Sequence, residues 1–327
     1  GVGTGMLWVS STVSVRKWFV GKSYGTWWGI AFMGAPMAQV LLSLIVKPVL
    51  TGPDAGPDSW RSAMRILAVI VFVALMLAAA IAKKSPDAYG LKPFGLAAAT
   101  GAAPAKKETD WTPKTAFKTF PIWGTVVAFL TAMIGEFLIW TQVVRFWTVD
   151  AKMDLATATN LYIFIGISGI FTMPLMGKVS DALVQKFGNE TKARKAMLIF
   201  APAVGILACL LLLASGSGSF IIGVVACILF AIYWAIEPGG CAGYAGSIYG
   251  GKSLGRIWGL ATLIVMGIGP ALGTFAGSAL GAGGSYVPSV WFALGGFVIS
   301  TVVASFLPLA ARVPEKQEEA VSQAVEA

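Results

Sequence analysis

Long apolar segments separated by short polar stretches run along almost the whole chain. Most are about 20 residues or longer, the length of an α-helix that crosses a hydrocarbon core of about 30 Å, whereas the strands of a membrane barrel would alternate in polarity over about 10 residues. The pattern predicts an all-α membrane protein with about nine transmembrane segments, the first one short. The segments are 1–16, 24–48, 60–82, 119–148, 155–177, 195–215, 219–245, 255–280 and 287–310.

The composition supports this class of protein. The 327 residues are 57% hydrophobic and 12% charged, whereas soluble domains carry about 25% charged residues. Cys209, Cys227 and Cys241 stand apart in apolar segments, and the chain has no histidine. These features argue against a disulfide framework, a metal centre or a catalytic triad. We therefore expect no metal, no cofactor and no enzyme activity.

The basic residues are unevenly divided between alternate loops. Of 24 Lys and Arg residues, 19 lie within 16–22, 83–118, 178–195, 252–256 and 312–316. The other loops hold Lys47, Arg61, Arg65, Arg145 and Lys152. Because cytoplasmic loops are rich in Lys and Arg, the first set and the C-terminal tail are predicted to be cytoplasmic, in the inner (plasma) membrane. The same bias explains the net charge of +9 without a nucleic-acid partner.

One stretch of the chain occurs twice. Residues 21–31 (GKSYGTWWGIA) and 251–261 (GKSLGRIWGLA) are identical at seven of eleven positions. A general excess of small residues does not explain the shared Lys-Ser and Trp-Gly pairs. Such a repeat between apolar segments indicates two homologous halves. Six apolar segments follow the polar stretch 84–118, and the second copy stands between the fourth and fifth of them.

The repeat also predicts the domain organisation. The expected parts are the remainder of an N-terminal bundle (1–83), a connector (84–118), a C-terminal six-helix bundle (119–311) and a tail (312–327). If the halves match, about three helices of the first bundle, roughly 100 residues, precede Gly1 in the source gene. A start codon directly before Gly1 would contradict this expectation.

A short segment near the end of the fifth apolar run resembles a known loop motif. Residues 177–181 (GKVSD) are similar to the Gly-x-x-x-Asp-Arg signature of the major facilitator superfamily, with Ala182 in place of the usual basic residue. Helix order, connector and repeat extend the resemblance over essentially the whole chain. It implies a major facilitator fold of two pseudo-symmetric six-helix bundles, acting as a monomer. Such a protein moves a small solute by alternating access around a central site.

The same resemblance implies which residues control this movement. Glycine lets two helices approach, and an aspartate can face the positive N-terminus of a neighbouring helix and hold one conformation. Gly177 and Asp181 occupy these positions, and by pseudo-symmetry the neighbouring helix is the one that starts at 22–25. The residues of the repeat expected to take part are Lys22, Gly25, Lys252, Gly255 and Arg256.

The segment directly after the third apolar run carries a second resemblance. Residues 85–95 (SPDAYGLKPFG) are similar to the Pro-x-x-x-Gly-Leu-x-Pro-x-Gly stretch of bacterial monocarboxylate-type and oxalate/formate-type transporters. This resemblance implies a small organic anion as substrate. Such relatives carry a basic residue in helix eight or eleven, whereas 155–177 and 257–280 contain none. The alternative is a carrier of a sugar, an amino acid or a cationic drug, and a further one is a non-transporting receptor.

Two carboxyl groups lie inside predicted membrane segments, where ionisable side chains are costly and usually functional. Glu136 lies near the middle of 119–148, with Trp140 one turn away on the same helical face. Glu237 lies nearer the cytoplasmic end of 219–245, before a break expected at Pro238. A buried carboxyl can bind and release a proton, so either residue is a candidate for coupling transport to protons.

A few other polar residues are candidates to line the transport path. Arg145, in the outer half of 119–148, is either a cation for an anionic substrate or a snorkelling anchor at the rim. Gln39, Asn160 and Tyr162 are the remaining candidates. The expected partners are therefore a small-molecule substrate, protons and membrane lipid.

Overall fold

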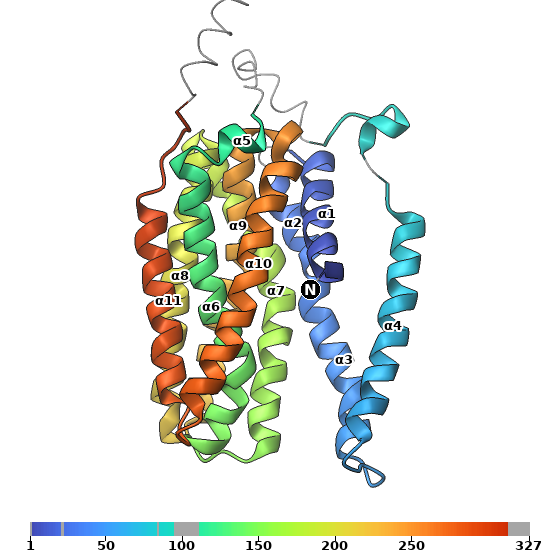
Figure 1. Ribbon diagram of the computed structural model, residues 1–327, viewed down its shortest axis with the longest axis vertical. Coiled ribbons are helices and arrows are strands. Elements are labelled where there is room, and N and C mark those ends of the chain that lie inside the picture. Colours follow the sequence, from blue (N-terminus) through green and yellow to red (C-terminus); the bar gives the residue numbers. More distant parts are fainter. Residues whose placement is uncertain (1, 21–22, 84, 95–110, 313–327) are drawn as a thin grey trace, which may run out of the picture.

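The computed structural model describes residues 2–20, 23–83, 85–94 and 111–312, and its long helices run side by side (Figure 1). Within this described part, 8 helical stretches are long and apolar enough to cross a membrane. The expected segment 1–16 forms the shorter helix α1 (Val2–Trp18), which has 17 residues. The prediction of an all-α membrane protein is confirmed.

The helices of the C-terminal part pack around one another. Helix α6 lies against α10 and α11, α8 lies against α9 and α11, and α7 lies against α9. Their bounds are α6 (Phe120–Val149), α7 (Leu155–Phe187), α8 (Glu190–Ala214), α9 (Phe220–Tyr249), α10 (Gly251–Gly281) and α11 (Val287–Ser305). The short helix α5 (Pro113–Ala116) covers one end of the bundle, which we call the connector end (Figure 1). The turn η3 (Ser215–Ser217) lies at the opposite end.

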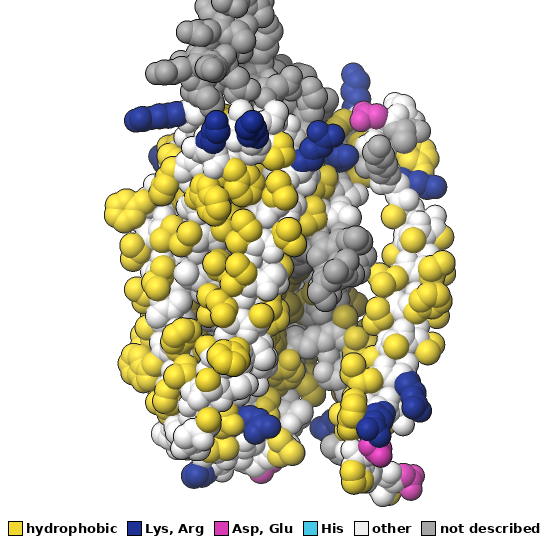
Figure 2. Space-filling model, viewed as in Figure 1, with side chains coloured by type: hydrophobic (Ala, Val, Ile, Leu, Met, Phe, Trp, Pro, Cys, Tyr) yellow, Lys and Arg dark blue, Asp and Glu magenta, His cyan; other side chains and the backbone are white. Residues whose placement is uncertain are grey.

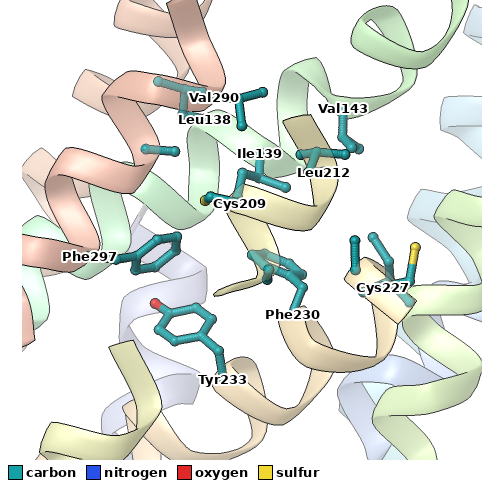
Figure 3. Packing of buried hydrophobic residues seen from close by; sticks show 14 of the residues in the cluster. Leu138, Ile139, Val143, Cys209, Leu212, Cys227, Phe230, Tyr233, Val290 and Phe297 are labelled. Carbon is teal, nitrogen blue, oxygen red and sulfur yellow. The ribbon is translucent and has the colours of Figure 1, made fainter. Parts of the chain in front are cut away.

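Apolar and aromatic side chains fill the centre of this bundle (Figure 3). The Tyr233 ring of α9 lies 4.7 Å from the Phe297 ring of α11 and 5.7 Å from the Phe230 ring, measured between centroids. Lipid tails are as apolar as this core, so burial alone does not hold membrane helices together. Close van der Waals packing of the interlocking rings and branched side chains supplies the attraction instead.

Helix α7 continues beyond the membrane segment expected at 155–177. It ends only at Gly188, whose φ of 61° forms the left-handed cap of the helix. The Asn189 side chain then accepts the backbone N–H of Lys192 and caps α8. The motif 177–181 therefore lies on a helix and not in a loop, because the residues from Lys178 to Phe187 include neither proline nor glycine.

The break expected at Pro238 is absent, and α9 runs through this position without interruption. A proline removes one helical hydrogen bond, yet membrane helices tolerate it because packing against neighbouring helices and local adjustment compensate for the loss. Pro174, Pro202 and Pro270 likewise lie inside α7, α8 and α10. The prediction of a break was wrong for this reason.

The N-terminal helices form a looser group. Helices α2 (Tyr24–Phe32) and α3 (Gly34–Thr51) divide the expected segment 24–48 at Met33, because Pro36 has no N–H to donate to the carbonyl of Phe32. Both helices pack against α7, whereas α1 packs against α10. Helix α4 (Ser59–Ile81) contacts α3 and stands apart from the other helices (Figure 1).

The surface fits a membrane environment. Apolar side chains cover the visible outer face of the bundle and of α4, while Lys and Arg side chains gather near the two ends of the helices (Figure 2). Charged groups at helix ends reach the polar headgroups without crossing the hydrocarbon region. The domain boundaries 1–83, 84–118, 119–311 and 312–327 stay predictions, since 95–110 and 313–327 lie outside the described residues.

Helices α2 and α7 approach each other through glycine. A Cβ atom on Gly29 would overlap the Met173 carbonyl group, and one on Gly177 would overlap the Gly25 carbonyl group. Backbone atoms cannot rotate out of the way as a side chain can, so no larger residue fits these positions. The seam between α2 and α7 is therefore closed backbone against backbone.

Gly29 and Gly259 occupy matching positions of the repeat, and they give a matched test of this seam. We expect Gly29→Ala to lower the free energy of unfolding by about 1–3 kcal/mol, because the added methyl group overlaps backbone. In Gly259→Ala the methyl group would lie 3.6 Å from Val9 Cγ1, an ordinary contact. Thermal unfolding in detergent measures both variants, and equal midpoints for the two would contradict the description of the seam.

Candidate functional site

The two motifs that the sequence analysis linked are in contact at the connector end. Asp181 of α7 is 4% exposed. Its carboxylate accepts the backbone N–H groups of Gly25 at 2.8 Å and Thr26 at 2.6 Å. These N–H groups belong to the first turn of α2, where free donors and the helix dipole favour an anion. Asp181 therefore ties α7 to the N-terminus of α2, while Lys22 lies outside the described residues.

Arg194 of α8 supplies the positive charge beside Asp181. It is 1% exposed, and its Nη2 atom lies 3.1 Å from Asp181 Oδ1 and 3.6 Å from Glu190 Oε1. Its Nη1 atom donates to Ser180 Oγ. Since Ala182 follows Asp181 where similar motifs have a basic residue, the charge comes from the next helix. Sequence reasoning missed this role, although Glu190 and Arg194 are spaced to lie on one helical face.

Glu190 extends these contacts to α1. Its Oε1 atom accepts a hydrogen bond from Arg16 Nη1 at 2.7 Å. The guanidinium groups of Arg16 and Arg194 also lie 4.7 and 5.3 Å from the centroid of the Tyr24 ring, where the electron-rich face attracts cations. The connector-end network therefore joins α1, α2, α7 and α8. It consists of Arg16, Tyr24, Asp181, Glu190 and Arg194.

The second copy of the repeat begins α10 at the same end of the molecule. Gly255 faces α1, and a Cβ atom there would lie 3.6 Å from the Val13 side chain. Arg256 is exposed, and the side chain of Lys252 is outside the described part. The first copy starts α2, which packs against α7, and the second copy starts α10, which packs against α1. In both cases the contact joins an N-terminal helix to a helix of the C-terminal bundle. This arrangement agrees with the pseudo-symmetry expected from the repeat.

Glu136 is buried in the middle of α6, with 3% of its surface exposed. Its Oε1 atom accepts the indole N–H of Trp140 at 3.2 Å, which confirms that the two side chains share a helical face. Its Oε2 atom accepts the hydroxyl of Tyr233, from α9, at 3.0 Å. A buried carboxyl is tolerated only when its oxygens have such partners. Both oxygens of Glu136 meet this condition.

Trp140 is also the centre of an aromatic cluster. Its ring lies 5.6 Å from Tyr162 of α7, 5.2 Å from Phe230 and 5.1 Å from Trp234, measured between centroids and at steep angles. Phe230 is buried, whereas the other three rings are half-buried. We call Trp140, Tyr162, Phe230 and Trp234 the aromatic cluster. Its other three rings surround the Trp140 indole, which donates a hydrogen bond to Glu136.

The aromatic cluster lies beside α3, where the N-terminal helices meet the bundle. A Cβ atom on Gly169 of α7 would lie 2.8 Å from Pro36 Cβ and 3.2 Å from Trp234 Cζ3. Gln39 of α3 donates to the Tyr162 carbonyl at 3.3 Å. The structure therefore brings Gln39 and Tyr162 together with Trp140 and Glu136 at one seam.

Two predicted path residues lie elsewhere. Arg145 is exposed toward the opposite end of α6, and its Nη1 atom lies 3.5 Å from the Tyr286 hydroxyl. This position suits the snorkelling anchor, which the sequence analysis offered as one of two roles. Asn160 is exposed near the start of α7. Neither residue belongs to the group around Glu136.

Glu237 lies one turn after Tyr233 on α9, and its surface is fully buried. Within the described residues, its Oε1 atom accepts a hydrogen bond only from the Cys241 thiol, with the sulfur 3.6 Å away, and its Oε2 atom has no hydrogen-bond partner. A thiol is a weak donor. One weak donor does not compensate an ionised carboxylate, which distinguishes Glu237 from Glu136.

A helical membrane protein with buried carboxyl groups beside a seam between two helix groups has the construction of a membrane carrier. Comparison with known protein families agrees with this class, since the model described as Major Facilitator Superfamily matches residues 1–274. The chain belongs to the major facilitator superfamily, a family of multi-pass membrane transporters. The monocarboxylate-type branch, the missing helices, the type of membrane and the orientation stay predictions.

The buried ion pair at the connector end can be compared with an exposed one. We expect Asp181→Ala to lower the free energy of unfolding by about 3–5 kcal/mol, because it removes the nearest anionic partner of the buried Arg194 and the acceptor of two backbone N–H groups. In the matched control Asp58→Ala, the lost pair with Arg61 spans 2.7 Å but is 73% and 56% exposed, so little change is expected. Denaturation in detergent measures both, and similar losses would contradict the importance of burial.

Proposed function

We propose that this protein is a secondary active transporter that moves a small organic solute by alternating access, coupled to protons through Glu136. The observation that carries the proposal is the position of this carboxyl group. It is buried in the middle of α6, bonded to α9, and next to half-buried aromatic rings at the seam with α3. An ionisable group so far from either helix end is costly in a membrane, and transport provides a reason for it.

The two partners of Glu136 differ in what they can do when a proton binds. The Trp140 indole can only donate, so the oxygen that it bonds cannot turn a new O–H group toward it. The Tyr233 hydroxyl can both donate and accept. A proton on Glu136 therefore belongs on Oε2, where Tyr233 turns from donor to acceptor. Proton binding thus acts on the hydrogen bond that joins α6 to α9.

The connector-end network supports the alternating-access part of the proposal. Asp181 and Glu190 hold α2 and α1 against α7 and α8 through groups that can separate without breaking either bundle. In this role the network closes the connector end while a solute exchanges at the opposite end. Separation of the carboxylate from the N-terminus of α2 would then open the connector end.

The organic anion inferred from segment 85–95 stays a prediction. In the structure this segment pairs with the end of α1, where Phe94 N–H donates to the Trp18 carbonyl at 2.8 Å and Val20 N–H donates to the Phe94 carbonyl at 3.0 Å. Gly90 has a φ of 65°, which explains a glycine at this turn. The segment therefore anchors α1 at the connector end, and these contacts do not involve the residues around Glu136.

Among the alternatives of a sugar, an amino acid or a cationic drug, one observation favours a cationic solute. The carboxyl group of Glu136 accepts a hydrogen bond from Trp140, whose ring contacts the ring of Trp234. By contrast, the basic side chains Arg145 and Arg194 lie toward the two ends of the bundle. An anion near Glu136 would meet a like charge unless that carboxyl were protonated.

Glu136→Gln tests the proton coupling. The amide retains the shape and an acceptor for Trp140 but cannot take up a proton at neutral pH. We expect uptake to lose its response to a proton gradient of either direction, because no proton can bind at this position. The measurement is uptake by the full-length gene product in proteoliposomes, using labelled anionic, neutral and cationic solutes. An unchanged response to the gradient would remove Glu136 from the coupling mechanism.

Asp154→Asn is the matched control for this carboxyl-to-amide change. Hydrogen bonds from the Thr157 side chain and N–H group hold the pKa of Asp154 below its usual value, so it stays ionised at neutral pH. Asparagine caps a helix as well as aspartate does. We therefore expect uptake and its response to the gradient to be unchanged in this variant.

A further inference from the structure

We propose that Glu136 and the aromatic cluster form a binding site for an organic cation, a quaternary or protonated amine, which occupies the carboxylate alternately with a proton. The inference rests on the proposed transport function and names the substrate class of the same site. A cation and a proton that compete for one carboxylate would be exchanged across the membrane in opposite directions.

The chemistry of the site matches a bulky cation. A carboxylate supplies the opposite charge, and the faces of Trp and Tyr rings attract ammonium groups, with Trp the strongest. Trp140 and Trp234 lie 5.1 Å apart at an interplanar angle of 73°, so one ring of the pair keeps a face that the other does not cover. Trp140, Trp234 and Tyr162 are half-buried. Ring surface is therefore left for a ligand next to the buried carboxyl.

The position of the cluster gives a ligand a way in. Trp234 lies near Pro36 across Gly169, and the backbone of Tyr162 is bonded by Gln39. A movement of α3 away from α7 would therefore uncover the rings, and alternating access requires movement at this seam. The amide of Gln39 also offers a neutral polar contact, which a cation with a hydroxyl or carbonyl group could use.

The charges around Glu136 favour a cation over an anion. Within the described residues, neighbouring helices α9 and α7 place no basic group beside Glu136. Tyr233 and Glu237 of α9 interact with it and Tyr162 of α7 contacts Trp140, whereas Lys178 and Lys186 lie toward the connector end of α7. Helix α11 contains no ionisable residue, and those of α10 are Lys252 and Arg256 in its first turns at the connector end. A cation would meet compensating charge here, whereas an anion would meet none.

Exchange at this carboxyl is balanced in charge. The protonated form of Glu136 loses its O–H proton to water, and the carboxylate that remains pairs with the incoming cation. Tyr233 then turns back and donates to Oε2, while Trp140 continues to donate to Oε1. Each cation that binds to the protonated form therefore releases one proton into solution.

Three probes of the same shape and different charge test the inference. They are choline, its neutral isostere with carbon in place of nitrogen, and the anion tert-butylacetate. Binding to the purified full-length gene product is measured by calorimetry, and released protons are measured with an indicator dye in weak buffer. The titration is repeated from mildly acidic to mildly alkaline pH. We expect choline to bind best and to release protons, and Glu136→Gln to abolish the release.

Substitutions at Trp234 distinguish the contribution of its aromatic face to choline binding from a general effect on folding. Trp234→Phe keeps an aromatic face and should bind choline within a few-fold of the parent. Trp234→Leu keeps an apolar side chain but removes the ring, and should weaken choline binding about 2- to 30-fold. Neither change removes a hydrogen bond to Glu136, because Trp140 and Tyr233 make both. Equal affinities of the two variants would overturn the role of the aromatic face.

The outcomes distinguish this inference from the proposed transport function. Tighter binding of tert-butylacetate or of the neutral isostere, with gradient-driven uptake that depends on Glu136, would overturn the cation site and leave proton-coupled transport standing. Choline binding without proton release at any pH would overturn the shared carboxylate. Choline binding with proton release, but without gradient-driven uptake of any solute, would support the site and overturn the transport function.

Discussion

The contact between the Asp181 carboxylate and the first turn of α2 fixes how the two groups of helices meet. The N-terminus of a helix carries unpaired N–H groups and a partial positive charge, and Asp181 satisfies both at once. With this end fixed, Gly29 and Gly177 bring the backbones of α2 and α7 into contact along the seam. Arg194 keeps the buried carboxylate compensated, and through Glu190 it connects the same point to Arg16 of α1.

A second buried carboxyl group lies farther along the bundle, with a different kind of support. Asp181 is bonded to backbone and to a fixed cation, which suits a structural contact that is either made or broken. Glu136 is bonded by an indole and a phenol, and the phenol can reverse the direction of its hydrogen bond. The second arrangement can hold either protonation state without loss of a partner. The two carboxyl groups are therefore suited to different tasks, closure of one end and exchange of a proton.

The short segment at 85–94 resembles a stretch of known transporters, yet it lies apart from the residues around Glu136. Its glycine at position 90 serves a left-handed turn, and its last residue pairs with the end of α1. These contacts give the pattern a structural role near the connector. They say nothing of the solute, because the aromatic rings and the carboxyl that could meet a solute come from α6, α7 and α9.

The sequence by itself determined the class of protein, the number and order of most helices, the family and the pairing of Asp181 with the helix that starts near Gly25. The class and the helices follow from segment length, whereas the family and the Asp181 pairing follow from the repeat and from the resemblance of residues 177–181 to a known motif; all of these can be read along one chain. Only the tertiary structure decided that Arg194 partners Asp181, that Tyr233 partners Glu136, and that α9 passes through Pro238 unbroken. Each of these depends on which helix faces which, and in a membrane that choice is made by close packing and by the need to pair every buried polar group.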